Sequence, residues 1–191
     1  MFEERTRTLQ ARLANAGLAV ALITNDDSVY YFSGFYDYLH MEFGRPTILA
    51  VPAQGAPVLV TPTIELEMAQ GMTWIEDIRP WQDGEGSEWR GDLQQLIETV
   101  GSAAIGIERG SMSSLVRDFV DHSVTDSNLT DITSLIAELR MIKSNEELQL
   151  ARHSGQVAMA MMTAGRDAIR EGVPEYEVAF ATSEAGARSA A

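Results

Sequence analysis

Two kinds of hydrophobic pattern divide this chain near residue 140. Before that point, helical patterns alternate with short apolar runs typical of buried strands, and this alternation favours an α/β domain. Beyond it no strand pattern remains, and two long helical patterns follow at about residues 144–171 and 174–188. A pair of helices has an apolar face that it cannot bury alone. We therefore expect a complete α/β domain over residues 1–140 and, over residues 141–191, the first helices of a second, truncated domain.

The first 140 residues predict a mixed sheet with helices on both of its faces. A helical pattern at residues 3–16 is followed by Gly17, the residue that commonly ends a helix. Residues 47–51 and 57–61 have the pattern of two antiparallel strands, because a turn rich in proline and glycine joins them. Further strands are expected at residues 18–24, 74–78, 103–108 and 122–125, and further helices at 64–70, 87–100, 111–119 and 132–139.

Composition excludes several classes of partner and chemistry. The chain holds 28 acidic and 14 basic residues, a formal net charge of −14, which repels nucleic acids and anionic membrane surfaces. No apolar run approaches the roughly 18–20 residues that cross a bilayer, and the N-terminus lacks the pattern of a secretory signal. The chain has no cysteine, and therefore no disulfide or thiolate site. We expect a cytoplasmic protein that binds neither nucleic acid nor membrane.

Neither a metal site nor a catalytic group is expected within this chain. The histidines, His40, His122 and His153, lie far apart and without the spacing of metal ligands. The sequence contains no GxSxG nucleophile motif, no phosphate-binding glycine loop and no HExxH motif. The acidic segment around Gly84 is better explained as a surface loop.

The most informative candidate site lies between two predicted strands, at residues 30–46. This long connection combines many aromatic side chains with Arg45, and long connections are uncommon unless they serve a function. Arginine can hold a carboxylate through two parallel hydrogen bonds, and the nearby Phe43 could exclude water from that contact. Arg45 is thus a candidate substrate anchor. The alternative is that the aromatic residues form a small satellite core and that Arg45 makes a structural ion pair.

Four segments together resemble the creatinase and prolidase/aminopeptidase P superfamily. MIKSNEE at residues 141–147 and EGVPEYEVA at 171–179 are similar to its domain junction, and Ser144 with Glu147 also has the spacing of a helix capping box. YYFSG at residues 30–34 and FGRP at 43–46 resemble the creatinase branch more than the proline peptidases.

The resemblance implies a two-domain, homodimeric hydrolase with a creatinase-like N-terminal α/β domain and a "pita-bread" α+β catalytic domain. In that family the N-terminal domain of one subunit reaches the active site of the other. By position, Phe43 and Arg45 match residues that hold the substrate carboxylate in creatinase. The family's catalytic histidine and its Asp/Asp/His/Glu/Glu metal-binding positions belong to the part of the catalytic domain beyond this chain, so the chain alone is expected to be inactive.

The implied reaction is hydrolysis of a C–N bond in a small amino-acid derivative that carries a carboxylate. Creatinase-like members do this without a metal, whereas the peptidases use a dinuclear Mn, Co or Zn centre. Within the creatinase-like branch, ectoine hydrolase is a closely related possibility. An Xaa-Pro dipeptidase or aminopeptidase P is the alternative enzyme. A catalytically silent binding module of the same fold is the alternative outside enzymes.

Overall fold

The computed structural model describes residues 1–37, 44–84, 88–124 and 128–191. It divides into two compact units, Met1–Leu139 and Arg140–Ala191, which are described separately. None of the helices in these described ranges has the length and apolar character of a membrane span.

The first unit is built on a six-stranded sheet in the order β4-β3-β2-β1-β5-β6. Only β2 runs antiparallel to its neighbours β1 and β3, and the other adjacent strands pair in parallel. The mixed sheet and the antiparallel hairpin expected from the sequence are thus confirmed. The strands are β1 (Leu18–Ile23), β2 (Ile48–Pro52), β3 (Val58–Pro62), β4 (Asp77–Trp81), β5 (Ala104–Ile107) and β6 (Leu129–Asp131).

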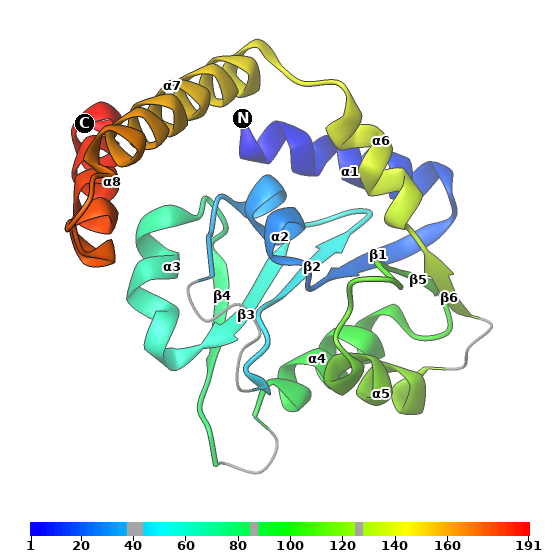
Figure 1. Cartoon of the computed structure of the whole chain (residues 1–191). Helices are drawn as coiled ribbons and strands as arrows, with labels where there is room; N and C mark the ends of the chain where they lie inside the picture. Colours follow the sequence, from blue (N-terminus) through cyan, green and yellow to red (C-terminus); the bar gives the residue numbers. More distant parts are fainter. Residues whose placement is uncertain (38–43, 85–87, 125–127) are drawn as a thin grey trace. The chain divides into compact units, whose positions relative to one another are not determined.

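Helices cover both faces of the sheet, as the sequence predicted (Figure 1). One face packs against α1 (Phe2–Asn15), α2 (Asp26–Ser33), α3 (Leu66–Met72) and α6 (Thr133–Met141), and the other against α4 (Trp89–Val100) and α5 (Ser114–Ser123). Because side chains alternate along a strand, Val20 and Leu22 of β1 join the core under α4 and α5, whereas Ala21 and Ile23 join the opposite core. Burial on both faces explains why β1 is a continuous apolar run.

Helix α2 was not predicted, because its aromatic residues concealed the helical pattern. The side chain of Asn25 accepts a hydrogen bond from the backbone N–H of Ser28 and so caps the first turn. Val29 and Phe32 face the core from this helix. The supposed long connection at residues 30–46 is therefore shorter, since a helix occupies its first part.

Two predicted strands were misplaced. The strand expected at residues 74–78 pairs instead as Asp77–Trp81, although Ile75 before it is buried. The strand expected at residues 122–125 is wrong, because α5 continues through Ser123 and the last strand is β6. Val116, Val120 and Val124 recur at intervals of four and are all buried, so the apolar signal there belonged to one helix face.

Gly34 is required where α2 ends. Its backbone is left-handed (φ 80°), and a Cβ added there would lie 2.9 Å from the Phe2 ring and 3.3 Å from the carbonyl oxygen of Met72. A left-handed conformation costs a non-glycine residue about 1–2 kcal/mol before any crowding. We expect Gly34→Ala to lower the free energy of unfolding by more than that in a urea titration.

Gly17 provides the matched control for this prediction. It also has a positive φ (70°), but nothing lies within 4 Å of an added Cβ. Gly17→Ala should therefore show the conformational cost alone. Equal losses for the two variants would contradict the role assigned to the close approach of Phe2 and Met72.

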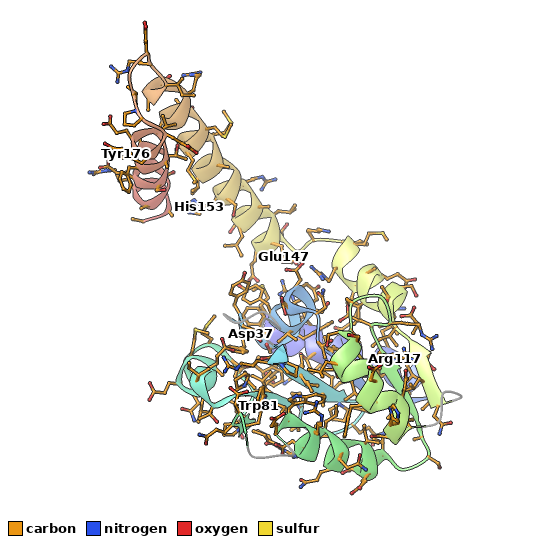
Figure 2. The ribbon with its side chains drawn as sticks, turned by 60° about the horizontal axis from the view of Figure 1, so that its bottom comes forward. Asp37, Trp81, Arg117, Glu147, His153 and Tyr176 are labelled. Carbon is orange, nitrogen blue, oxygen red and sulfur yellow. The ribbon has the colours of Figure 1, made fainter. Side chains whose placement is uncertain are left out.

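The second unit is a helical hairpin of α7 (Asn145–Ala168) and α8 (Glu175–Ala190). The predicted capping box is confirmed: Ser144 Oγ accepts from the N–H of Glu147, whose carboxylate accepts from the N–H of Ser144, at the end of α7 labelled by Glu147 in Figure 2. A Cβ on Gly186 would lie 2.9 Å from the side chain of Met161. Glycine thus lets the two helices approach closely.

This hairpin leaves large apolar side chains exposed. Val157 and Met161 are half-buried, whereas Ile169 is exposed. Further exposed residues of the unit are Met141, Ile142, Leu148, Leu150, Met159, Met162, Tyr176 and Phe180. Exposed apolar surface of this kind drives association.

We expect the 191-residue chain to form dimers or larger aggregates in light scattering at micromolar concentration. Replacing the exposed Met162 and Phe180 with glutamine should reduce this association, because both side chains are about 70% exposed. Replacing the half-buried Met161 instead should weaken the hairpin. A monodisperse monomer of the unmodified chain would contradict the prediction.

Candidate functional site

The strand directions bring Arg45 to a specific edge of the sheet. Strands β3 and β4 are parallel and end at Pro62 and Trp81, and β2, which runs the opposite way, begins at Ile48 beside the end of β3. Arg45, shortly before β2, therefore lies at the edge where the parallel strands end. In open α/β sheets this is the edge at which ligands usually bind.

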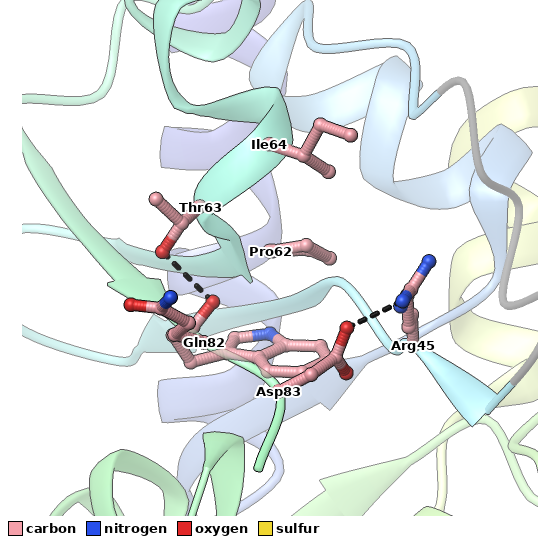
Figure 3. Close-up of a pocket in the computed structure, with 7 residues that line it drawn as sticks. Arg45, Pro62, Thr63, Ile64, Gln82 and Asp83 are labelled. Atoms are coloured by element: carbon pink, nitrogen blue, oxygen red, sulfur yellow. Dashed lines mark hydrogen bonds and ion pairs between the residues drawn. The ribbon is translucent and has the colours of Figure 1, made fainter. Parts of the chain in front are cut away.

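A pocket of about 360 Å³ opens at this edge (Figure 3). Its size is within the range of sites for small molecules. Apolar, polar and charged groups all contribute to its wall. The lining residues are Arg45, Pro62, Thr63, Ile64, Trp81, Gln82 and Asp83.

Arg45 forms an ion pair inside this pocket. Its Nη2 lies 2.5 Å from Oδ2 of Asp83, and the two side chains are 35% and 55% exposed. The ion pair that the sequence analysis gave as the alternative role for Arg45 is therefore observed. Pairs this exposed to solvent contribute only about 0–1 kcal/mol to stability. Stability alone thus gives little reason for an arginine here, and its remaining N–H groups can still meet a ligand.

Hydrogen bonds hold the backbone beside Arg45 in place. The indole Nε1 of Trp81, which is 4% exposed, donates to the carbonyl oxygen of Pro46 at 3.2 Å. Thr63 Oγ1 donates to the carbonyl oxygen of Trp81 at 2.9 Å, and the hydroxyls of Thr47 and Thr61 lie 3.0 Å apart. The start of β2 and the ends of β3 and β4 are thus linked, which positions the Arg45 backbone.

The neighbouring arginine Arg79 does not contribute to the pocket lining. It lies on β4 and contacts Asp77 at 3.0 Å and Asp92 at 3.7 Å. The hydrogen bonds that Arg79 donates to Asp77, together with the charges of both acids, raise the pKa of Arg79 above its ordinary value despite partial desolvation. Arg45 is therefore the positive charge among the described residues that line the pocket.

The other residues of the candidate segment 30–46 divide between the core, the surface and the part outside the described residues. Phe43, the second candidate anchor, and His40 lie outside the described residues. Phe32 and Phe35 are fully buried, which fits the alternative that part of the aromatic run serves as core. Tyr36 is 47% exposed and is not among the residues lining the pocket.

Acidic residues at the far part of the same edge have structural partners. The buried Glu108 accepts a hydrogen bond from Ser28 at 2.9 Å, which ties α2 to the end of β5. Hydrogen bonds from the side chain and backbone of Thr133 lower the pKa of Asp131, which precedes α6. Across the described ranges, no three histidine, aspartate or glutamate side chains are grouped to hold a metal.

Sequence reasoning missed Trp81, Gln82 and Asp83 as site residues. Trp81 is the last residue of β4, and Gln82 and Asp83 follow it, whereas the predicted strand ended at residue 78. Had the pairing of Val58 with Asp77 been foreseen, the end of the strand and the two positions after it would have indicated the pocket.

Comparisons with known proteins identify relatives of this chain. The family model for the Creatinase/Prolidase N-terminal domain matches residues 5–142. The creatinase of Bacillus sp. (strain B-0618) is 30% identical over 99% of this chain and 46% of its own length. The Xaa-Pro dipeptidase of Lactobacillus helveticus is 27% identical over 90% of this chain and 46% of its own length. The chain spans about half the length of these relatives.

Solved structures show the same fold. The X-Pro aminopeptidase from Thermotoga maritima MSB8 superposes with a TM-score of 0.79 at 18% identity, over 97% of this chain and 49% of that one. The N-terminal domain of an X-Pro dipeptidase from Streptococcus pyogenes superposes with a TM-score of 0.61 at 16% identity, over 71% of this chain and 98% of that one. Together with the family model, these matches confirm the resemblance seen in the sequence: the chain belongs to the creatinase/prolidase N-terminal domain family.

Proposed function

We propose that this chain is the N-terminal portion of a creatinase-like hydrolase that cleaves a C–N bond in a small amino-acid derivative bearing a carboxylate. The chain supplies substrate-binding residues, and a catalytic domain outside it supplies the chemistry. The observation that carries the proposal is the position of Arg45, a partly exposed guanidinium in a pocket at the ligand-binding edge of the sheet. The 30% identity to a creatinase supports this branch of the family.

In this proposal Arg45 holds and orients the substrate carboxylate. A guanidinium presents N–H groups in a planar fork that matches both oxygens of a carboxylate. Its backbone is fixed through Pro46 and Trp81, so that little freedom is lost when the ligand binds. Phe43 would exclude water from the contact. Orientation of this kind helps place the scissile C–N bond against a catalytic group.

We further propose that Arg45 acts in trans, in a homodimer whose partner subunit contributes the catalytic domain. Among the described residues that line the pocket there is no histidine, and the carboxylate there, that of Asp83, is paired with Arg45. It therefore has the features of a binding site that needs acid–base groups from elsewhere.

An Xaa-Pro peptidase is the second candidate, favoured by the 27% identity to the Xaa-Pro dipeptidase of Lactobacillus helveticus. The experiment uses the longer protein, that is, this chain together with its proposed catalytic domain. Incubating it with creatine and with an Xaa-Pro dipeptide, each with and without a chelator, distinguishes the creatinase-like hydrolase from the peptidase. We expect release of urea or another amidine-derived product that the chelator leaves unchanged. Release of proline that the chelator abolishes and Mn²⁺ restores would identify the peptidase. Turnover of neither substrate class would favour the catalytically silent binding module.

A further inference from the structure

The wall of the pocket contains a positive and a negative group in direct contact. Of the lining residues that the structure describes, Arg45 and Asp83 are the charged ones, and their side chains point toward one another beside Pro62 (Figure 3). Asp83 is the more exposed of the two, at 55% against 35%. Its carboxylate can therefore be reached from the solvent while the pair is intact.

Binding of an external carboxylate to Arg45 changes the charge balance of the pocket. The guanidinium has five N–H donors and contacts Asp83 through Nη2, so it can bind a second carboxylate. Two carboxylates then share one positive charge. Arg79 does not compensate for this excess, because it is already paired with Asp77 and Asp92. A ligand that is only an anion leaves an uncompensated negative charge beside the apolar wall of Pro62 and Ile64.

The charge of the whole chain also disfavours binding of a ligand that is only an anion. A formal net charge of −14 repels a ligand that is negative overall. A zwitterion avoids this repulsion, because its net charge is zero. Its cationic group can also offset the second carboxylate within the pocket.

We propose that Asp83 is a specificity-determining residue: it receives the cationic group of a ligand whose carboxylate is bound by Arg45. The ligand class is then a zwitterionic amino-acid derivative rather than a simple carboxylic acid. This inference rests on the proposed function, since it takes Arg45 as the carboxylate anchor. It adds a second recognition point that the sequence motifs did not include.

The test compares two ligands of nearly the same shape, 4-aminobutyrate and pentanoate, which differ by an ammonium group in place of a methyl group. Each is titrated into the 191-residue chain and followed by NMR chemical shifts. We expect 4-aminobutyrate to bind about five-fold more tightly, the upper limit for a solvent-exposed charge pair. In Asp83→Asn this preference should disappear, and in Asp83→Glu it should return in part.

Arg45→Ala separates failure of this inference from failure of the proposed function. If Arg45→Ala weakens both ligands but Asp83→Asn keeps the preference for 4-aminobutyrate, only the role of Asp83 is overturned. If Arg45→Ala changes neither ligand, or if the unmodified chain binds neither, the anchor itself is overturned. Thermal unfolding of each variant confirms that the change in binding does not arise from unfolding.

Discussion

Replacing Arg45 with alanine in the longer protein lowers kcat/KM for a carboxylate-bearing substrate by about 5- to 150-fold, which corresponds to about 1–3 kcal/mol. The loss arises because the substrate carboxylate keeps its negative charge but loses its charged hydrogen-bond donor. Arg45 contributes little to stability, since its pair with Asp83 is partly exposed to solvent. The variant should therefore unfold at nearly the same temperature as the unmodified protein. Initial rates over a range of substrate concentrations provide the measurement.

Arg117 offers a matched control for this kinetic prediction. It also pairs with an aspartate, Asp121, but lies on α5 and is not among the residues lining the pocket (Figure 2). Arg117→Ala should leave kcat/KM unchanged. Equal kinetics for Arg45→Ala and Arg117→Ala would contradict the assignment of Arg45 as the anchor.

Replacing Phe32 with alanine lowers the free energy of unfolding of the first unit by about 3–5 kcal/mol, the usual range for removing a buried phenylalanine ring. The Phe32 side chain is fully buried in the core between α2 and the sheet. Its carbonyl oxygen accepts hydrogen bonds from Thr6 and from the indole of Trp74. Loss of the ring thus disturbs a position where α1, α2 and the segment after α3 meet. Urea titration followed by circular dichroism measures the effect.

Tyr30 in the same helix is the control. It is 40% exposed and makes edge-to-face contacts with Phe2 and Tyr36 at ring distances of 5.6 and 6.2 Å. Such contacts contribute about 0.5–1.5 kcal/mol, so Tyr30→Ala should cost much less than Phe32→Ala. Similar losses for both variants would show that the aromatic run does not divide into core and surface positions as the structure indicates.

The sequence predicted the elements that have their own local pattern. Strand β1 was recognised because both of its faces are buried, and the hairpin of β2 and β3 because its turn residues are specific. The start of α7 was recognised because Ser144 and Glu147 satisfy each other's backbone. Each of these signals lies within a few residues and needs no knowledge of the tertiary structure.

The elements that were missed depend on contacts distant in sequence. Strand β4 is defined by its register with β3, from Val58 and Asp77 to Pro62 and Trp81, which no local pattern reveals. Helix α2 is capped by Asn25, but its aromatic residues have only average helix propensity, and packing of Phe32 stabilises it. Misplacing β4 also concealed Asp83, the ion-pair partner of Arg45.

Arg45 itself was predicted from residue chemistry and from the family resemblance, and the structure adds the pocket and the Asp83 contact. Its role as an anchor stays a prediction, as does that of Phe43. The domain limits at residues 1–140 and 141–191, the homodimer and the metal dependence also stay predictions.

The central claim is that Arg45 serves the active site of a partner subunit, and mixing two impaired variants of the longer protein tests it directly. One variant carries Arg45→Ala and keeps a residual activity, and the other lacks the catalytic histidine that the family resemblance implies. If Arg45 acts in trans, each mixed dimer contains one intact site, and random exchange of equal amounts of the two variants adds about a quarter of the unmodified activity to that residual level. If activity stays at the level of the separate variants after proven subunit exchange, Arg45 does not act across a dimer.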